Sequence, residues 1–250
     1  MFKLAPWPRK SAQAAPRAPE GKRVYAVGDI HGRADLLDDL LARIEADVNG
    51  ANSILVFLGD YVDRGADSRG VIDQLITLAE RGHELVFLRG NHEAAMLNFL
   101  RNPETGMRWV KIGGGETMRS YGVEPPTREA EPAAFEAAAL ALREAVPDTH
   151  IKFLNSLTLT ARYGDYVFVH AGLRPGRDLH QQEMEDLLEI RAPFLKSNVR
   201  WPFVVVHGHS PVERGYRDER RIAIDTGAYA TGRLSAVRLD GEAVDFIATS

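Results

Sequence analysis

The sequence predicts an α/β fold in which two stacked β-sheets of mixed strand direction lie between layers of helices, a four-layer α/β/β/α sandwich. Three observations support this prediction. Short apolar runs rich in β-branched and aromatic residues alternate with helical patterns in the first hundred residues. A second set of strand-like runs follows between residues 157 and 247. A glycine-, proline- and alanine-containing stretch separates the two sets.

The N-terminal set has the order strand, helix, strand, helix, strand. Strand-like runs lie at 24–27, 54–58 and 85–88. Apolar residues at 36, 37, 40, 41 and 44 give a helical stripe after the first run, and those at 71, 72, 75, 76 and 78 do so after the second. A third helix is expected to open at 93–100. This order predicts parallel strands.

The C-terminal set supplies the second half-sheet in this prediction. Its strand-like runs lie at 157–162, 166–169, 203–206, 222–224, 234–239 and 243–247. Residues 102–150 interrupt the pattern, and we expect them to form an inserted helical cap shaped in part by the three glycines at 113–115. No boundary requires a second domain, so 22–250 is predicted to be a single domain.

Residues 1–21 have the composition of a disordered basic tail, with four prolines, five alanines, four basic residues and one acid. No apolar run is long enough for a signal peptide or a membrane span, which requires roughly 18 apolar residues. A cytoplasmic location is therefore the expectation. The oligomeric state is left open, and a monomer is compatible with the sequence.

The composition excludes several classes of function. The formal net charge of −4 argues against a nucleic-acid-binding protein, which is usually strongly basic. The chain has no cysteine, so disulfides, thiolate nucleophiles, zinc fingers and iron–sulfur ligation are excluded. Any metal must be bound by histidine, carboxylate, amide or backbone oxygen, which directs attention to the eight histidines.

Polar blocks follow five of the predicted strands. They are 28–32 (GDIHG), 59–65 (GDYVDRG), 89–93 (RGNHE), 170–172 (HAG) and 207–210 (HGHS). In open α/β sheets, ligands bind outside the carboxyl ends of the strands. These blocks would therefore bring six side chains to one edge: Asp29, His31, Asp60, Asn91, His170 and His209.

Oxygen and imidazole ligands of this kind favour Mn, Fe or Zn over calcium. Six ligands exceed the need of one tetrahedral ion, and Asp60 has a carboxylate able to bridge. Two ions about 3.5–4 Å apart, as in phosphatases and nucleases, are the natural inference. Taken singly, each block has a structural explanation, such as a turn at Asn91 or a core histidine at His170 or His207. Their joint occurrence favours the metal site. His83, His150 and His180 lie outside the blocks and are expected to be structural or exposed.

The ordered blocks resemble the signature of the calcineurin-like metallophosphoesterases. More narrowly, they resemble the phosphoprotein phosphatase (PPP) family of serine/threonine phosphatases in its short bacterial form. The resemblance runs from about Arg23 to Leu239 and is loosest between residues 102 and 150. It implies a catalytic domain of that type over 22–250.

The resemblance also implies a role for each residue. Asp29, His31 and Asp60 would bind one metal, and Asp60, Asn91, His170 and His209 the other. His92 would be the general acid, oriented by Asp63. Arg64 would bind the phosphoryl group together with Asn91 and a second arginine. Arg191 is favoured as that second arginine and Arg174 is the rival.

The implied function is metal-dependent hydrolysis of phosphate monoesters by in-line attack of a hydroxide that bridges two divalent ions, with Mn²⁺ favoured and Fe or Zn as alternatives. The implied substrate is a phosphorylated protein or a small phosphoester. A dinucleotide polyphosphatase is the second hypothesis, although such relatives usually lack the aspartate found here at Asp63. A catalytically silent scaffold is the third. Ala171 replaces a glycine of the eukaryotic enzymes, and the chain ends soon after its last strand, so regulatory subunits of their kind are not expected.

Overall fold

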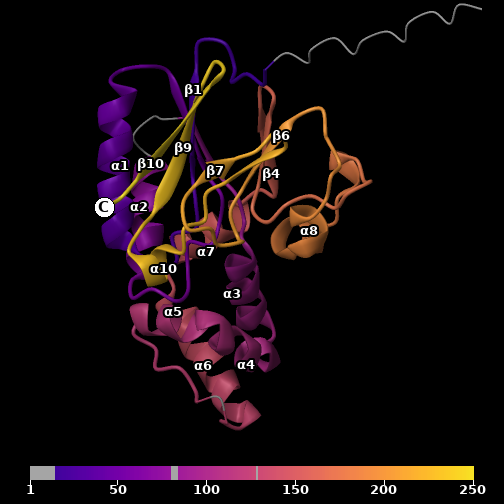
Figure 1. Cartoon of the computed structure of the whole chain (residues 1–250). Coiled ribbons are helices and arrows are strands. Elements are labelled where there is room, and N and C mark those ends of the chain that lie inside the picture. Colours follow the sequence, from indigo (N-terminus) through magenta and orange to yellow (C-terminus); the bar gives the residue numbers. More distant parts are fainter. Residues whose placement is uncertain (1–14, 80–83, 128) are drawn as a thin grey trace, which may run out of the picture.

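The computed structural model describes residues 15–79, 84–127 and 129–250 (Figure 1). Two five-stranded sheets form its centre. The first has the order β10-β9-β1-β2-β3. Its strands are β1 (Arg23–Val27), β2 (Ser53–Phe57), β3 (Glu84–Phe87), β9 (Ser235–Asp240) and β10 (Ala243–Ala248). Strands β1, β2 and β3 run parallel, as the strand–helix alternation predicts, whereas β9 is antiparallel to both β1 and β10.

The second sheet has the order β4-β5-β6-β8-β7. Its strands are β4 (Thr160–Tyr163), β5 (Tyr166–Val169), β6 (Val204–His207), β7 (Tyr216–Arg217) and β8 (Arg221–Ala223). The three inner strands β5, β6 and β8 are parallel, and the two outer strands pair antiparallel to them. Both sheets are therefore mixed, as expected.

Alternation of side chains along the strands produces the layers. Val24 and Ala26 of β1 belong to the same buried apolar cluster as Tyr166 and Phe168 of β5, so this cluster lies between the two sheets. The intervening β1 residues Tyr25 and Val27 face the helices instead. Because successive side chains of a strand point to opposite faces, both faces of this sheet are buried. This packing confirms the predicted four-layer sandwich.

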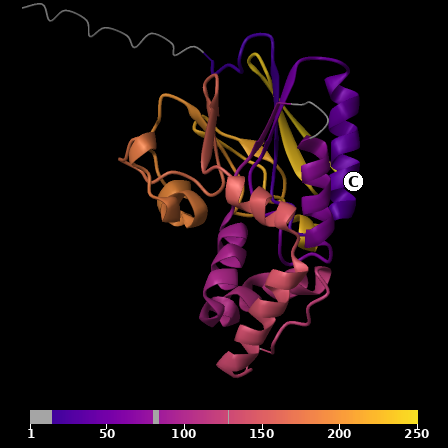
Figure 2. The ribbon, with the colours of Figure 1, turned by 180° about the vertical axis from the view of Figure 1, so that it is seen from behind.

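Helices cover the outer face of each sheet (Figures 1 and 2). Helices α1 (Ala34–Val48) and α2 (Ser68–Ala79) pack on the first sheet, joined by α7 (Asp148–Ser156). Helices α8 (Met184–Glu189) and α9 (Ala192–Leu195) pack on the second. Within the described ranges, none of the helices is both long and apolar enough to cross a membrane.

The stretch predicted to be a cap folds into short helices at one end of the sandwich, below the sheets in Figure 1. After α3 (Asn91–Arg101) come η1 (Pro103–Thr105), α4 (Gly106–Trp109), the π-helical turn η2 (Val110–Gly114), α5 (Gly115–Ser120) and α6 (Pro132–Ala145). Hereafter "the cap" means η1 to α6. A small helix, α10 (Ala228–Thr231), lies between β8 and β9.

Two features of the sheets differ from expectation. Strands β9 and β10, expected in the second sheet with their neighbours in sequence, belong to the first. β2 pairs with only one edge of β1, so the other edge is free to accept β9 as the chain returns. Strand β7 was not predicted, because two residues are too few to give a periodic signal.

The prediction of a disordered tail over 1–21 is wrong for residues 15–21. Residues 1–14 lie outside the described residues. Ala18 is buried in the apolar cluster between the sheets, and its N–H donates to the carbonyl of Gly241 at 2.8 Å. The carbonyl of Arg17 accepts a 2.9 Å hydrogen bond from the N–H of Asp165. Gly241 and Asp165 lie in turns of different sheets, so this segment crosses the end of the sandwich.

Replacing Ala18 with aspartate is expected to lower the free energy of unfolding by about 2 kcal/mol or more, because a charged side chain would be buried between the sheets without a partner. Urea unfolding followed by circular dichroism measures this change. The exposed Glu20, changed to alanine, is the control. Equal unfolding midpoints for the two variants would show that 15–21 does not contribute to the core.

Candidate active site

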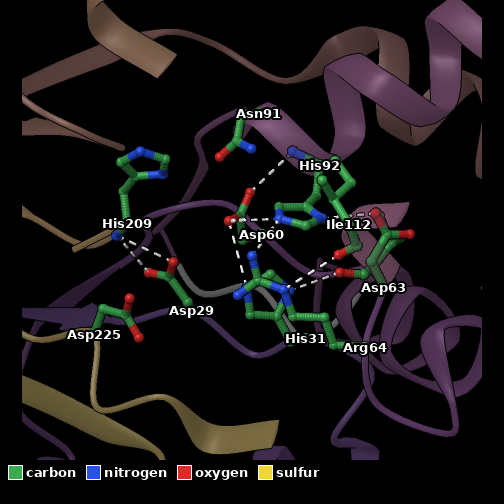
Figure 3. Close-up of polar contacts among 12 residues, drawn as sticks. Asp29, His31, Asp60, Asp63, Arg64, Asn91, His92, Ile112, His209 and Asp225 are labelled. Carbon is green, nitrogen blue, oxygen red and sulfur yellow. Dashed lines mark hydrogen bonds and ion pairs between the residues drawn. The ribbon is translucent and has the colours of Figure 1, made fainter. Parts of the chain in front are cut away.

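The loops that follow the parallel strands converge on one buried cluster (Figure 3). Strands β1, β2, β3, β5 and β6 deliver the six side chains predicted to be metal ligands. Asp29, His31, Asp60, His170 and His209 are all at least nine-tenths buried. Figure 3 shows Asp60 at the centre, with Asp29 and His209 on one side and His31 and His92 on the other. Carboxyl ends of parallel strands meet at one edge of a sheet, and here two sheets contribute.

The backbone of this cluster is unusual. Among the described residues, six non-glycine residues have a positive φ, and five of them belong to the site: His31, Asp60, Asp63, Arg64 and His209. Each such conformation costs on the order of 1–3 kcal/mol and persists only where the surroundings enforce it. Conformations of this kind collect at functional sites, so the backbone supports the same location as the side chains.

Glu93 enforces part of this geometry. It is fully buried at the start of α3, and its carboxylate accepts hydrogen bonds from the N–H groups of Asp60 (2.9 Å), Tyr61 (2.7 Å) and Gly90 (2.8 Å). Sequence reasoning assigned Glu93 no role. The available signal was its position three residues after Gly90, where a glutamate at a helix start can accept the backbone N–H of the N-cap residue.

Two overlapping groups of ligand atoms could bind metal. His31, Asp60 and His92 form one, and Asp60, His170 and His209 form the other, with ligand atoms within 4.8 Å of one another in each. The predicted ligand Asp29 is in neither group, and the first group contains His92, the predicted general acid. The carboxylate of Asp60 is common to both: its Oδ2 lies 3.5 Å from His31 Nε2, and its Oδ1 lies 3.4 Å from His170 Nε2. Asp60 therefore occupies the position that a bridging ligand needs.

The histidines have the orientation that metal binding requires. Nδ1 of His31 donates to the carbonyl of Val62, and Nδ1 of His170 donates to the carbonyl of Leu58, both at 2.9 Å. These bonds leave the Nε2 lone pairs directed toward Asp60. Nε2 of His209 is buried and has no hydrogen-bond partner within the described residues. The donor set thus fits divalent metal ions.

The electrostatics agree with this fit. Burial lowers the pKa of His31 to about 3 and that of His209 to about 3, so both rings are neutral, the form that binds metal. Burial also favours neutral His170, but the charge of Asp60 outweighs it and raises the pKa of His170 to about 10. A positive charge is therefore stabilised between Asp60 and His170, and a metal ion would supply it in place of the proton.

Asn91 and Asp29 lie at the margin of the cluster. Asn91 Oδ1 is 3.0 Å from His170 Nε2. Both carboxylate oxygens of Asp29 accept from the N–H of His209, at 3.1 and 3.0 Å. Burial, followed by the charge of Asp225, raises the pKa of Asp29. Asp225 was missed, although it directly follows the predicted strand run 222–224 and so marks a sixth strand end at this edge.

Asp63, Arg64 and His92 form a second group beside the first. Asp63 Oδ2 lies 2.6 Å from His92 Nδ1. Arg64 Nη1 is 3.1 Å from His31 Nε2 and Arg64 Nη2 is 2.9 Å from His92 Nε2, while its guanidinium stacks 4.8 Å from the ring centroid of Tyr229. Burial opposes protonation of His92, but the charge of Asp60 and the hydrogen bond and charge of Asp63 outweigh it and raise its pKa.

The two candidate arginines differ in their partners. Arg191 lies beside the cluster: its Nη1 is 3.4 Å from Ser210 Oγ, and its charge contributes to the lowered pKa of His209. The guanidinium of Arg174 is instead bound by Asp186, with Nε 2.5 Å from Oδ2 and a second hydrogen bond from Nη2. The geometry favours Arg191.

The remaining histidines lie apart from the cluster. His150 is buried between Tyr121 Oη and Asp73 Oδ1, each 2.9 Å away, and so has a structural role. His207 is a core histidine whose ring packs edge-on against Phe194. His180 is exposed, and His83 lies outside the described residues.

This fold and this cluster define a metal-dependent hydrolase of the α/β sandwich type. The family model for calcineurin-like phosphoesterases matches residues 22–247. The chain therefore belongs to the calcineurin-like phosphoesterase family. The family implies a centre of two divalent metal ions, and the two overlapping groups that share Asp60 fit such a centre.

Relatives of two kinds resemble this chain over most of its length. Serine/threonine-protein phosphatase 1 of Salmonella typhimurium is 28% identical over 227 residues, which cover 87% of this chain and 92% of that protein. An asymmetrical bis(5'-nucleosyl)-tetraphosphatase of Anoxybacillus flavithermus is 27% identical over 237 residues, covering 85% of this chain and 88% of that protein. A crystal structure of a proposed diadenosine tetraphosphatase superposes with a TM-score of 0.65 at 23% identity, over 95% of this chain and 99% of that one, which supports the fold.

Changing Asp60 to asparagine is expected to reduce bound Mn²⁺ from about two ions per chain to one or none, because the shared carboxylate belongs to both groups of ligands. Equilibrium dialysis followed by elemental analysis measures the stoichiometry. Asp178, an exposed aspartate outside the site, changed to asparagine is the matched control. Two ions bound to the Asp60 variant would contradict its bridging position.

Proposed function

We propose that this protein hydrolyses phosphate monoesters with two divalent metal ions and acts as a serine/threonine protein phosphatase of the cytoplasm. The observation that carries this proposal is the 2.6 Å contact between Asp63 and His92, directly beside the ligands grouped around Asp60. A carboxylate-oriented histidine next to a metal centre suits protonation of a leaving alkoxide, which a serine or threonine ester requires.

Asp29, His31 and Asp60 would hold one ion, and Asp60, Asn91, His170 and His209 the other, with Mn²⁺ as the proposed metal and Fe or Zn as the alternatives. Bound divalent ions would lower the pKa of water and neutralise charge on phosphoryl oxygens. The chain's own contribution is to keep His31 and His209 neutral. It also fixes the rings of His31 and His170 through their hydrogen bonds to backbone carbonyls.

His92 would donate its Nε2 proton to the leaving oxygen, while Asp63 holds Nδ1–H and thereby fixes the orientation of the ring. The raised pKa of His92 supports this role, since it keeps the ring protonated to higher pH. Arg64 and Arg191 would bind the phosphoryl oxygens, because guanidinium groups match them in pairs. Tyr229 limits the directions that the Arg64 guanidinium can take.

An asymmetrical dinucleoside tetraphosphatase is the second candidate. Relatives with that name match this chain over nearly the same length and at nearly the same identity as the phosphatase relative. The presence of Asp63 favours a phosphate monoesterase. The similarity to known proteins supports a protein phosphatase and a dinucleoside tetraphosphatase equally. The catalytic centre proposed here would serve either substrate.

A direct comparison of substrates tests the proposal. Purified protein with Mn²⁺ is assayed on phosphoserine and phosphothreonine peptides and on diadenosine tetraphosphate, and kcat/KM is compared. A higher kcat/KM for the peptides supports the protein phosphatase. A higher value for the dinucleotide replaces it with the second candidate. No turnover of either substrate, or of p-nitrophenyl phosphate, would leave the scaffold hypothesis.

Changing His92 to asparagine is expected to lower kcat on phosphopeptides by roughly 10²–10⁴-fold, which is the usual contribution of a general acid. Steady-state kinetics measure this loss, and circular dichroism checks that the fold survives. The exposed His180, changed to asparagine, is the control. Full activity of the His92 variant would refute the general-acid assignment.

Changing Arg191 to alanine is expected to raise KM for phosphate esters about 10- to 100-fold, since one hydrogen bond to a charged group is worth about 1.5–3 kcal/mol. Inhibition by inorganic phosphate should weaken in parallel. The comparison variant is Arg174→Ala, which removes a guanidinium bound by Asp186. If that variant shows the raised KM and Arg191→Ala does not, the assignment of the second arginine must be reversed.

A further inference from the structure

We propose that two side chains of the cap, Trp109 and Thr117, are positioning residues that hold the Asp63 carboxylate in place against His92. This inference rests on the proposed function of His92 as the general acid. It gives the cap a role in positioning the proposed general acid.

The hydrogen bonds of Asp63 are the first step in the argument. Its carboxylate is completely buried and is bound on both oxygens. Oδ2 accepts from His92 Nδ1 at 2.6 Å and from the indole N–H of Trp109 at 2.9 Å. Oδ1 accepts from the hydroxyl of Thr117 at 2.6 Å. Two of the three donors therefore come from the cap, at the end of α4 and within α5.

Thr117 also fixes the backbone of Asp63. Its Oγ1 accepts a 2.8 Å hydrogen bond from the N–H of Asp63, and it lies 3.0 Å from Ser68 Oγ at the start of α2. Because the single hydroxyl proton of Thr117 goes to Asp63, Ser68 must donate in that contact. One hydroxyl thus bonds both the main chain and the side chain of the same residue.

Asp63 needs such support. Its φ of 74° places it in the left-handed region, and it lies in the loop between β2 and α2, outside any helix or strand. A neutral indole and a neutral hydroxyl can orient the carboxylate without neutralising it, whereas an arginine or lysine would compete with His92 for its charge. The two donors therefore fix the direction of the carboxylate and leave its charge available to the imidazole.

Trp109 is closely packed between α3 and the cap. The indole is 1% exposed and packs 5.0 Å from the ring of Phe99. A Cβ on Gly114 would lie 2.4 Å from the indole, and a Cβ on Gly113, whose φ is 119°, would lie 2.7 Å from Cγ of Arg64. The two glycines of the π-helical turn therefore allow its backbone to lie directly against Trp109 and Arg64. This close approach explains why these two positions are glycine.

The alternative is that Trp109 and Thr117 only supply the hydrogen bonds that a buried carboxylate requires for stability and have no effect on catalysis. The two explanations differ in how the loss depends on the leaving group. A misplaced general acid slows esters whose leaving group requires a proton far more than esters of p-nitrophenol, whose anion leaves readily. A loss of stability alone slows all substrates by the same factor.

The test compares kcat of Trp109→Phe and Thr117→Val on phenyl phosphate and on p-nitrophenyl phosphate, with Mn²⁺. We expect the loss on phenyl phosphate to exceed the loss on p-nitrophenyl phosphate by roughly tenfold, a part of the 10²–10⁴-fold effect of general acid catalysis. KM should change little. Thr117→Ser, which keeps the hydroxyl, should restore most of the difference, and Trp201→Phe, away from the site, serves as the matched control.

The outcomes separate the two proposals. A wild-type protein that hydrolyses no phosphoester overturns the proposed function and this inference with it. An active wild-type protein whose variants lose both substrates equally, or whose Thr117→Ser and Thr117→Val variants behave alike, overturns the inference alone. If Trp109→Phe fails to fold in thermal denaturation, the two Thr117 variants decide the question by themselves.

Discussion

The geometry of the site depends on the buried carboxylate of Glu93. It accepts backbone hydrogen bonds from Asp60, Tyr61 and Val62 in the loop after β2 and from Gly90 in the loop after β3. Without it, these buried N–H groups would lack a hydrogen-bond partner, at a cost of about 1–3 kcal/mol each. By joining two strand ends, it stabilises the left-handed conformation that directs the Asp60 carboxylate into the centre of the cluster.

The loop after β2 organises the remaining side chains. Its carbonyls at Leu58 and Val62 orient His170 and His31, and it carries Asp60, Asp63 and Arg64 itself. Groups from both sheets and from α3 are thus arranged around one segment of main chain. A backbone carbonyl fixes a ring without adding charge to the cluster.

Both kinds of relatives align with most of this chain, so the similarity does not distinguish one substrate from the other. Discrimination among phosphoesters must come from groups beyond the metal ligands. Arg191 and Tyr229 lie at the rim of the cluster and are partly or largely exposed, which suits contact with a substrate. In our proposal the cap also contributes to the site, because the side chains that orient Asp63 belong to it.

The sequence by itself determined the α/β class, the parallel βαβαβ half and the six ligand candidates, because strand periodicity and the polar blocks that follow strands are local signals. Tertiary structure decided what depends on non-local contacts. It placed β9 beside β1, seated Ala18 between the sheets and brought Asp225 to the same edge. It also paired Arg174 with Asp186, a contact that distinguishes this arginine from Arg191 and that the sequence does not reveal. Trp109 and Thr117 reach Asp63 across about fifty residues of sequence, a pairing that no local pattern encodes.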